Sequence, residues 1–158
     1  MTTSEAGVQA LTTLEAIRLA MYPDAGGKPT IGVGHLLTPD ELASGMLTLS
    51  EPDSWRDGLT GDQVRALLRQ DLADAEQVVT DSVTVPLAQH QFDALVSFVF
   101  NIGGEKFRDS TLLRQLNAGD YASIPAQLRQ WIHVGETENA GLRRRRELEV
   151  HLWEGATS

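Results

Sequence analysis

Two carboxylates, a hydroxyl and an imidazole follow one another between residues 15 and 35. Glu15 stands among leucines in a helical pattern, and partial desolvation of a carboxyl group favours its protonated form. Asp24 opens a Gly-rich turn, where a carboxylate stays hydrated and ionised, and Thr30 and His35 follow on a short Gly-containing strand. One protonated acid and one ionised acid form the pair that general acid–base cleavage of a bond requires.

Each of these residues also has a simpler structural explanation. Most helical glutamates are surface residues, aspartates are common in turns, and a lone histidine is more often hydrogen-bonded within the fold than a ligand. No second histidine lies at metal-binding spacing from His35, so we expect no metal site. Gly32 and Gly34 fit either the close approach of a ligand or a sharp bend, and their spacing is not that of a phosphate-binding loop.

The hydrophobic pattern indicates which elements position these residues. An apolar stripe of three-to-four spacing predicts a helix over residues 4–22 that a proline ends, and residues 22–35 then predict a small hairpin. Capping boxes at Thr38–Glu41 and Thr60–Gln63 predict the starts of a short helix and of a long helix. The polar stretch 47–60 between these helices is expected to be a loop.

The second half of the chain predicts a helical lobe. Residues 91–101 are apolar nearly all round, as in a buried central helix, and Asn101 at its end fits a helix cap better than a contact to a bound molecule. Trp131 is expected in the core rather than as a sugar platform. Further helices are predicted at 110–117, 123–132 and 142–153, with a polar loop at 135–141. The residues expected to face inward from the last helix are Leu142, Leu148, Leu152 and Trp153.

These elements predict an α+β fold that is mainly α. A small β-hairpin lobe, about residues 20–60, is joined by the long helix to a helical lobe of about residues 80–158 plus the N-terminal helix. We expect residues 1–158 to form a single domain with these two lobes.

Composition excludes several classes of protein. With 158 residues, of which 41% are hydrophobic, the chain can form one domain with a substantial core. The net charge of −9 opposes binding to nucleic acid or to anionic membranes, and the basic run Arg143–Arg146 is better explained by pairing with nearby acids. There is no cysteine, no apolar run long enough to span a bilayer and no signal-peptide pattern. We therefore expect no nucleic-acid partner and no stable membrane insertion. A monomer is the default expectation.

At residues 15–35 the sequence resembles the phage-type lysozymes of glycoside hydrolase family 24. The motif of that family is Glu, eight residues, Asp, five residues, Thr and an Ile-Gly-x-Gly-His run. Glu15, Asp24, Thr30 and residues 31–35 match it without a gap. The resemblance continues in order along the chain, at Gln91–Gly103, Ser110–Leu113, Leu116–Asp120, Trp131 and Gly141–Glu149.

The resemblance implies a lysozyme-like fold and an endolysin or muramidase that needs no cofactor. Such an enzyme hydrolyses the β-1,4 bond between N-acetylmuramic acid and N-acetylglucosamine in bacterial peptidoglycan. Glu15 would be the general acid, Asp24 would stabilise positive charge and orient water, and Thr30 would hold that water, with inversion of configuration. Substrate contacts are implied at Gly32 and Asn101.

The resemblance also implies supporting roles and a site of action. His35 would pair with Asp71 on the long helix, and Arg145 and Arg146 would anchor the last helix. An endolysin without a signal peptide would wait in the host cytoplasm until a membrane lesion releases it to the cell wall.

Two other functions compete with this interpretation. A lysozyme-like binding or scaffold module without turnover is favoured by the acidic charge and by Ala16, where the family often has glycine, but the intact Glu15, Asp24 and Thr30 oppose it. A lytic transglycosylase ranks lower, because its water-free chemistry would leave Asp24 and Thr30 without a role.

Overall fold

The computed structural model describes residues 1–14, 18–23, 29–32, 35–47 and 60–155. Contacts divide the chain into two compact units, one of Leu11–Asp71 and one of Met1–Ala10 with Leu72–Ser158. The first unit holds a three-stranded sheet, and the second holds a group of helices around one central helix.

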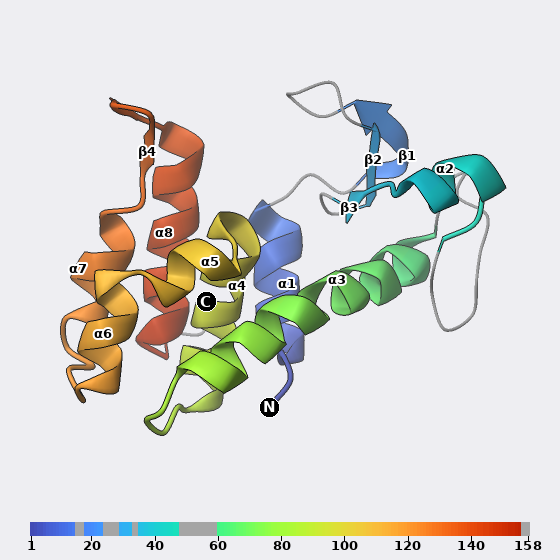
Figure 1. Cartoon of the computed structure of the whole chain (residues 1–158). Helices are drawn as coiled ribbons and strands as arrows, with labels where there is room; N and C mark the ends of the chain where they lie inside the picture. The colour runs from blue at the N-terminus through green and yellow to red at the C-terminus, as the bar shows by residue number, and fades with distance from the viewer. Residues whose placement is uncertain (15–17, 24–28, 33–34, 48–59, 156–158) are drawn as a thin grey trace. The chain divides into compact units, whose positions relative to one another are not determined.

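The sheet of the first unit is antiparallel and positions Thr30 on its central strand. The strands follow in the order β1 (Arg18–Pro23), β2 (Pro29–Gly32) and β3 (His35–Leu36), as Figure 1 shows. Thr30 pairs with Tyr22 of β1 on one side and with Leu36 of β3 on the other. The predicted hairpin of residues 22–35 is therefore too short, because the sheet begins at Arg18 and gains a third strand.

The N-terminal helix is shorter than its apolar pattern predicts. Helix α1 spans Glu5–Leu14 and buries Val8 and Leu11. The prediction of a helix over residues 4–22 is wrong, because Arg18–Pro23 forms strand β1. Pairing with β2 is a non-local interaction, and it overrides a local helical periodicity. Within α1, a Cβ at Gly7 would lie 2.7 Å from Thr3 Cγ2 and 2.9 Å from Asp93 Cγ, so a glycine is needed for this close approach.

Both predicted capping boxes are confirmed. At the start of α2 (Pro39–Ser44), the Thr38 hydroxyl accepts from the Glu41 amide at 3.1 Å and the Glu41 carboxylate accepts from the Thr38 amide at 3.0 Å. At the start of α3 (Gly61–Ser82), Thr60 and Gln63 make the same reciprocal pair at 3.2 and 2.7 Å. Helix α2 ends at Gly45, whose φ of 73° is the left-handed conformation that glycine adopts readily. The loop predicted at 47–60 lies mostly outside the described residues.

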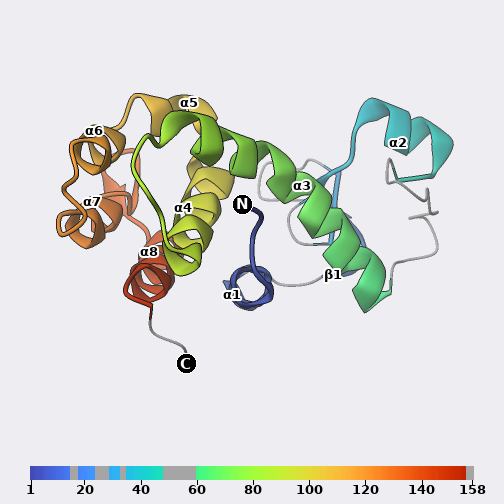
Figure 2. The ribbon, with the colours of Figure 1, turned by 90° about the horizontal axis from the view of Figure 1, so that it is seen from below.

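Helix α4 (Gln89–Ile102) is the centre of the second unit, as predicted for a segment that is apolar nearly all round. Residues 92–99 are all buried. Helices α5 to α8 are grouped with it, as Figures 1 and 2 show, and α8 contacts both α4 and α7. These helices are α5 (Gly104–Arg108), α6 (Thr111–Asn117), α7 (Ile124–Arg129) and α8 (Ala140–Trp153).

Several details of this unit differ from the prediction. Helix α5 was not predicted, and the helix expected at 123–132 covers only Ile124–Arg129. The expected polar loop at 135–141 contains part of a second hairpin, formed by β4 (His133–Val134) and β5 (Thr137–Glu138). Asn101 is not a helix cap, since α4 continues to Ile102 and Gly103 is its cap.

The inward face of α8 carries charged residues rather than the predicted leucines. Arg146 and Glu149 are 0% exposed and Arg145 is 8% exposed, together with buried Val150 and Trp153. The leucines at 142, 148 and 152 are half-buried rather than fully buried, whereas Trp153 is buried as predicted. An apolar pattern could not show this face, because burial of these charges depends on partners from other elements.

Candidate active site

Of the three residues predicted to be catalytic, the described structure includes only Thr30. Glu15 and Asp24 lie outside the described residues. Thr30 lies on the central strand β2 and is only 2% exposed, and Gly32 ends that strand, paired with Arg18 of β1. The structure thus places the residue expected to hold water at a fixed register within the sheet.

His35 begins the neighbouring strand β3, opposite Ile31 of β2, and is held by two carboxylates. Its Nδ1 lies 2.8 and 2.9 Å from the two carboxylate oxygens of Asp71 on α3, which is the predicted pair. Its Nε2 lies 2.9 Å from Oε1 of Glu41 on α2. Because an ionised carboxylate only accepts hydrogen bonds, both ring nitrogens must donate, and this arrangement holds the imidazolium form.

Glu41 is a residue that the sequence analysis recognised only as a helix-capping group. It is 2% exposed, and the same Oε1 accepts from the Thr38 amide and from His35. The capping box located Glu41 six residues after His35, but its second contact depends on how β3 meets α2. The Glu41 carboxylate therefore links the start of β3 to the start of α2.

The electrostatic balance around His35 favours its charged form. Burial lowers the pKa of the imidazole, but the hydrogen bonds and charges of Asp71 and Glu41 outweigh burial and raise the pKa above 6.5. A pKa raised by folding gives stabilisation that is fully present below about pH 6.5 and is lost as the pH rises through the raised value.

The variant Asp71→Asn is expected to lower the free energy of unfolding by about 2 kcal/mol at pH 5–6, because a charge-assisted hydrogen bond to His35 is lost. This loss should shrink above the raised pKa of His35, where the ring is neutral. Denaturant unfolding from pH 4 to 9 measures both effects. Asp74→Asn, at an exposed position one turn away on α3, is the control. Equal stability of Asp71→Asn and wild type from pH 4 to 8 would contradict the pair.

Arg146 and Glu149 form a second charged group, inside the helical unit. Arg146 Nε lies 2.7 Å from Glu149 Oε1, and the Ser97 hydroxyl on α4 donates to Glu149 Oε2 at 2.6 Å. The Arg146 guanidinium also lies 5.0 Å from the centre of the Phe98 ring. Burial raises the pKa of Glu149 to about 7, although Arg146, Ser97 and Arg145 oppose this shift. Burial likewise lowers the pKa of Arg146.

Asn101 hydrogen-bonds to Arg146 of this charged group and does not cap a helix. Arg146 Nη2 donates to Asn101 Oδ1 at 2.6 Å, and Nη1 donates to the Trp131 carbonyl at 3.4 Å. The three residues line one hollow of about 280 Å³ at the ends of α4 and α7. Trp131 is half-buried with its ring edge-to-face on Phe98 at 5.5 Å, so it is part of the core and part of this hollow.

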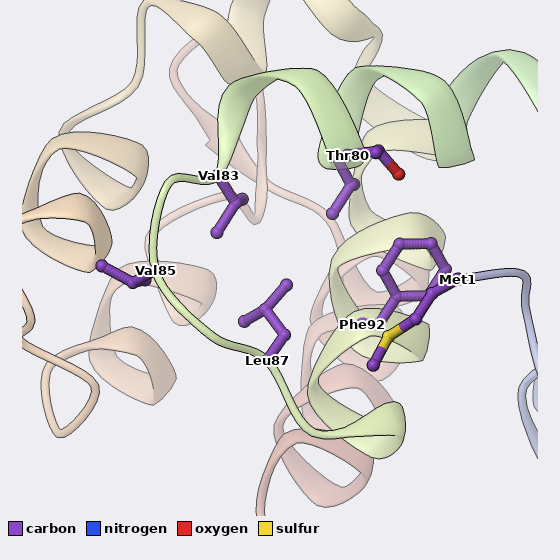
Figure 3. Close-up of a pocket in the computed structure, with 7 residues that line it drawn as sticks. Met1, Thr80, Val83, Val85, Leu87 and Phe92 are labelled. Carbon is purple, nitrogen blue, oxygen red and sulfur yellow. The ribbon is translucent and has the colours of Figure 1, made fainter.

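A second hollow, of about 160 Å³, is apolar apart from Thr80. It is lined by residues of the N-terminus, the end of α3, the following loop and α4, six of which Figure 3 labels. None of the described side chains that line it is charged, so these residues offer packing but no group for acid–base or electrostatic chemistry.

Within the described part of the chain, no group of three or more His, Cys, Asp and Glu side chains is arranged to hold a metal ion. Among the described helices, none has both the length and the apolar character needed to cross a membrane.

A family model described as Phage lysozyme matches residues 12–149, which is most of the chain. The protein belongs to the phage lysozyme family. It is therefore a peptidoglycan-hydrolysing glycoside hydrolase, and the predicted lysozyme-like α+β fold is confirmed. The matched region includes every residue for which the motif implied a role in catalysis or support.

Relatives of nearly equal length support this assignment. An endolysin of Salmonella phage P22 is 39% identical, with 96% of this chain and 99% of that protein covered. An endolysin of Acyrthosiphon pisum secondary endosymbiont phage 1 is 36% identical over 97% and 98% of the two chains. The crystal structure of a P22 lysozyme mutant matches this fold with a TM-score of 0.80 at 36% identity, over 98% and 99% of the two chains.

Proposed function

We propose that this lysozyme cleaves the β-1,4 bond between N-acetylmuramic acid and N-acetylglucosamine with inversion of configuration. The observation that carries the proposal is the position of Thr30 on the central strand β2. The adjacent strand β3 begins at His35, which is bound by carboxylates of α2 and α3. A hydroxyl at such a rigid position can hold a water molecule in one orientation, as an inverting reaction requires.

The chemical roles follow the family motif. Glu15 protonates the leaving oxygen, and Asp24 stabilises the developing positive charge and orients the attacking water that Thr30 holds. Gly32 and Asn101 contact the glycan. His35, Asp71, Arg145 and Arg146 keep the surrounding elements in place.

We also propose where the enzyme acts and in which oligomeric state. The protein acts as a monomer on the cell wall after release from the host cytoplasm, without a nucleic-acid partner. Its net charge of −9 gives no attraction to an anionic wall, so binding depends on local contacts rather than on long-range steering.

Products from purified peptidoglycan test the reaction. We expect fragments that have gained one water and whose new N-acetylmuramic acid ends are first formed as the α-anomer, since inversion of a β-linkage gives α. Mass spectrometry reads the water and proton NMR during the first minutes reads the anomer. An initial β-anomer would reverse the proposed stereochemistry. Anhydro ends would indicate a transglycosylase, and wall binding without any product would indicate a binding module.

A further inference from the structure

The two carboxylates that bind His35 act on different nitrogens of its ring. Asp71 accepts from Nδ1 at 2.8 and 2.9 Å, and a neutral imidazole can make this contact as well as a charged one, because Nδ1 carries the proton in one neutral tautomer. Glu41 lies 2.9 Å from Nε2, which in that tautomer has no proton and presents a lone pair. Asp71 therefore orients the ring, whereas the contact with Glu41 requires the imidazolium.

Glu41 is fixed on the side of α2, so it cannot adapt to a neutral ring. The same Oε1 accepts from the Thr38 amide at 3.0 Å, and the carboxylate is buried. Beside a neutral Nε2, this carboxylate would face a lone pair in a site with little water and would lose a charge-assisted hydrogen bond. Among the described residues, Glu41 of α2 and Asp71 of α3 are the charged groups that act on the imidazole, and both raise its pKa. Loss of the proton from His35 therefore breaks the link between β3 and α2.

The strand that begins at His35 depends on side-chain contacts for its position. Strand β3 is an edge strand of two residues. Within the described residues its pairs with β2 are His35 with Ile31 and Leu36 with Thr30. Such a short ladder gives little stability of its own. The residue that Glu41 binds is thus one pair away from Thr30, so a change at His35 Nε2 reaches Thr30 through one step of the sheet.

We propose that Glu41 is a positioning residue for the hydrolysis, because it holds His35 as an imidazolium and the charged ring keeps β3 against β2 with Thr30 at its register. The proposal rests on the proposed role of Thr30 in holding the attacking water. It adds a condition to that role: the hydroxyl is fixed while His35 is protonated and loses its orientation as the ring becomes neutral. Since the pKa of His35 is raised above 6.5, this condition is met at mildly acidic pH and is lost as the pH rises through the raised value.

Glu41→Gln tests this role with little change of shape. Glutamine fits the same position of a capping box, so the Thr38 amide keeps an acceptor, but the negative charge beside Nε2 is lost. We expect NMR titration of the ring protons to show that the pKa of His35 falls by about one unit in this variant. Asp40→Asn removes a carboxylate from the exposed neighbouring position on α2 and is the matched control. An unchanged titration of His35 in Glu41→Gln, or an equal shift in Asp40→Asn, would overturn the proposal.

The ratio of kcat between wild type and Glu41→Gln, measured against pH on soluble glycan strands, tests the effect on the reaction. The ratio cancels the titration of Glu15, which both proteins share. It should be close to one at pH 5 and should reach about ten-fold at the pH where NMR shows His35 charged in wild type and neutral in the variant. KM should change little, since Thr30 is proposed to hold water rather than sugar. A ratio that does not depend on pH would contradict the positioning role.

The methyl signal of Thr30 separates this inference from the reaction itself. Its NMR chemical shift is followed from pH 5 to pH 9 in wild type without substrate. We expect a transition at the same pH as that of His35, even if the enzyme releases no product. A Thr30 signal that stays constant while His35 titrates would disprove the positioning role and leave the proposed reaction intact. Because this comparison uses wild type alone, it does not depend on the folding of a variant.

Discussion

Glu15→Gln is expected to reduce the release of reducing ends from peptidoglycan by about 10²–10⁴-fold, because the amide keeps the size of the side chain but has no proton to give to the leaving oxygen. Clearing of outer-membrane-permeabilised Gram-negative cells should stop in parallel. Thermal unfolding should stay close to that of wild type, since the substitution is nearly isosteric.

The control for this variant is Glu136→Gln, which makes the same substitution in the exposed turn between β4 and β5. Both variants are compared with wild type at several salt concentrations, because screening weakens repulsion between an acidic enzyme and an anionic wall. Retention of full activity by Glu15→Gln would remove Glu15 from the mechanism. Loss of activity in both variants would point to an effect of surface charge.

Arg146→Met is expected to lower the free energy of unfolding by about 3–5 kcal/mol. The methionine fills a similar volume, but Glu149 is 0% exposed and would lose the cation that lies 2.7 Å from it. Arg144→Met, at an exposed position on the same helix, should change stability little. The double variant Arg146→Met/Glu149→Gln should recover much of the loss, since no unpaired charge then remains buried. Urea unfolding measures all three, and equal losses for Arg146→Met and Arg144→Met would contradict the role of the pair.

Glu149 also predicts a pH dependence. Its pKa rises from 4.5 to about 7 in the folded protein because of burial. Between pH 4.5 and pH 7 the folded state binds more protons than the unfolded state. The stabilising contribution of Glu149 is therefore present below about pH 4.5 and is lost as the pH rises through 7. A shift of this size corresponds to about 3 kcal/mol. Glu149→Gln should remove this component, and unfolding curves at pH 5 and pH 8 compare it directly with wild type.

Elements that are stabilised by interactions between residues close in the sequence could be predicted from the sequence. The capping boxes at Thr38 and Thr60 satisfy backbone amides within four residues, and the segment 91–101 is apolar on every side, so both could be read without tertiary information. The catalytic motif also has fixed spacing, which made the resemblance to phage lysozymes visible in the sequence.

Features that depend on contacts between residues far apart in the sequence became visible only in the tertiary structure. Strand β1 exists because β2 pairs with it, and no pattern within residues 18–23 showed that partner. Glu41 reads as a capping residue until β3 brings His35 to within 2.9 Å of it. Arg146 and Glu149 are buried because they neutralise each other and bond to Asn101 and Ser97 of α4, which compensates for the loss of water. Sequence reports the local preference of each segment, whereas the burial of a charge depends on the group that folding places beside it.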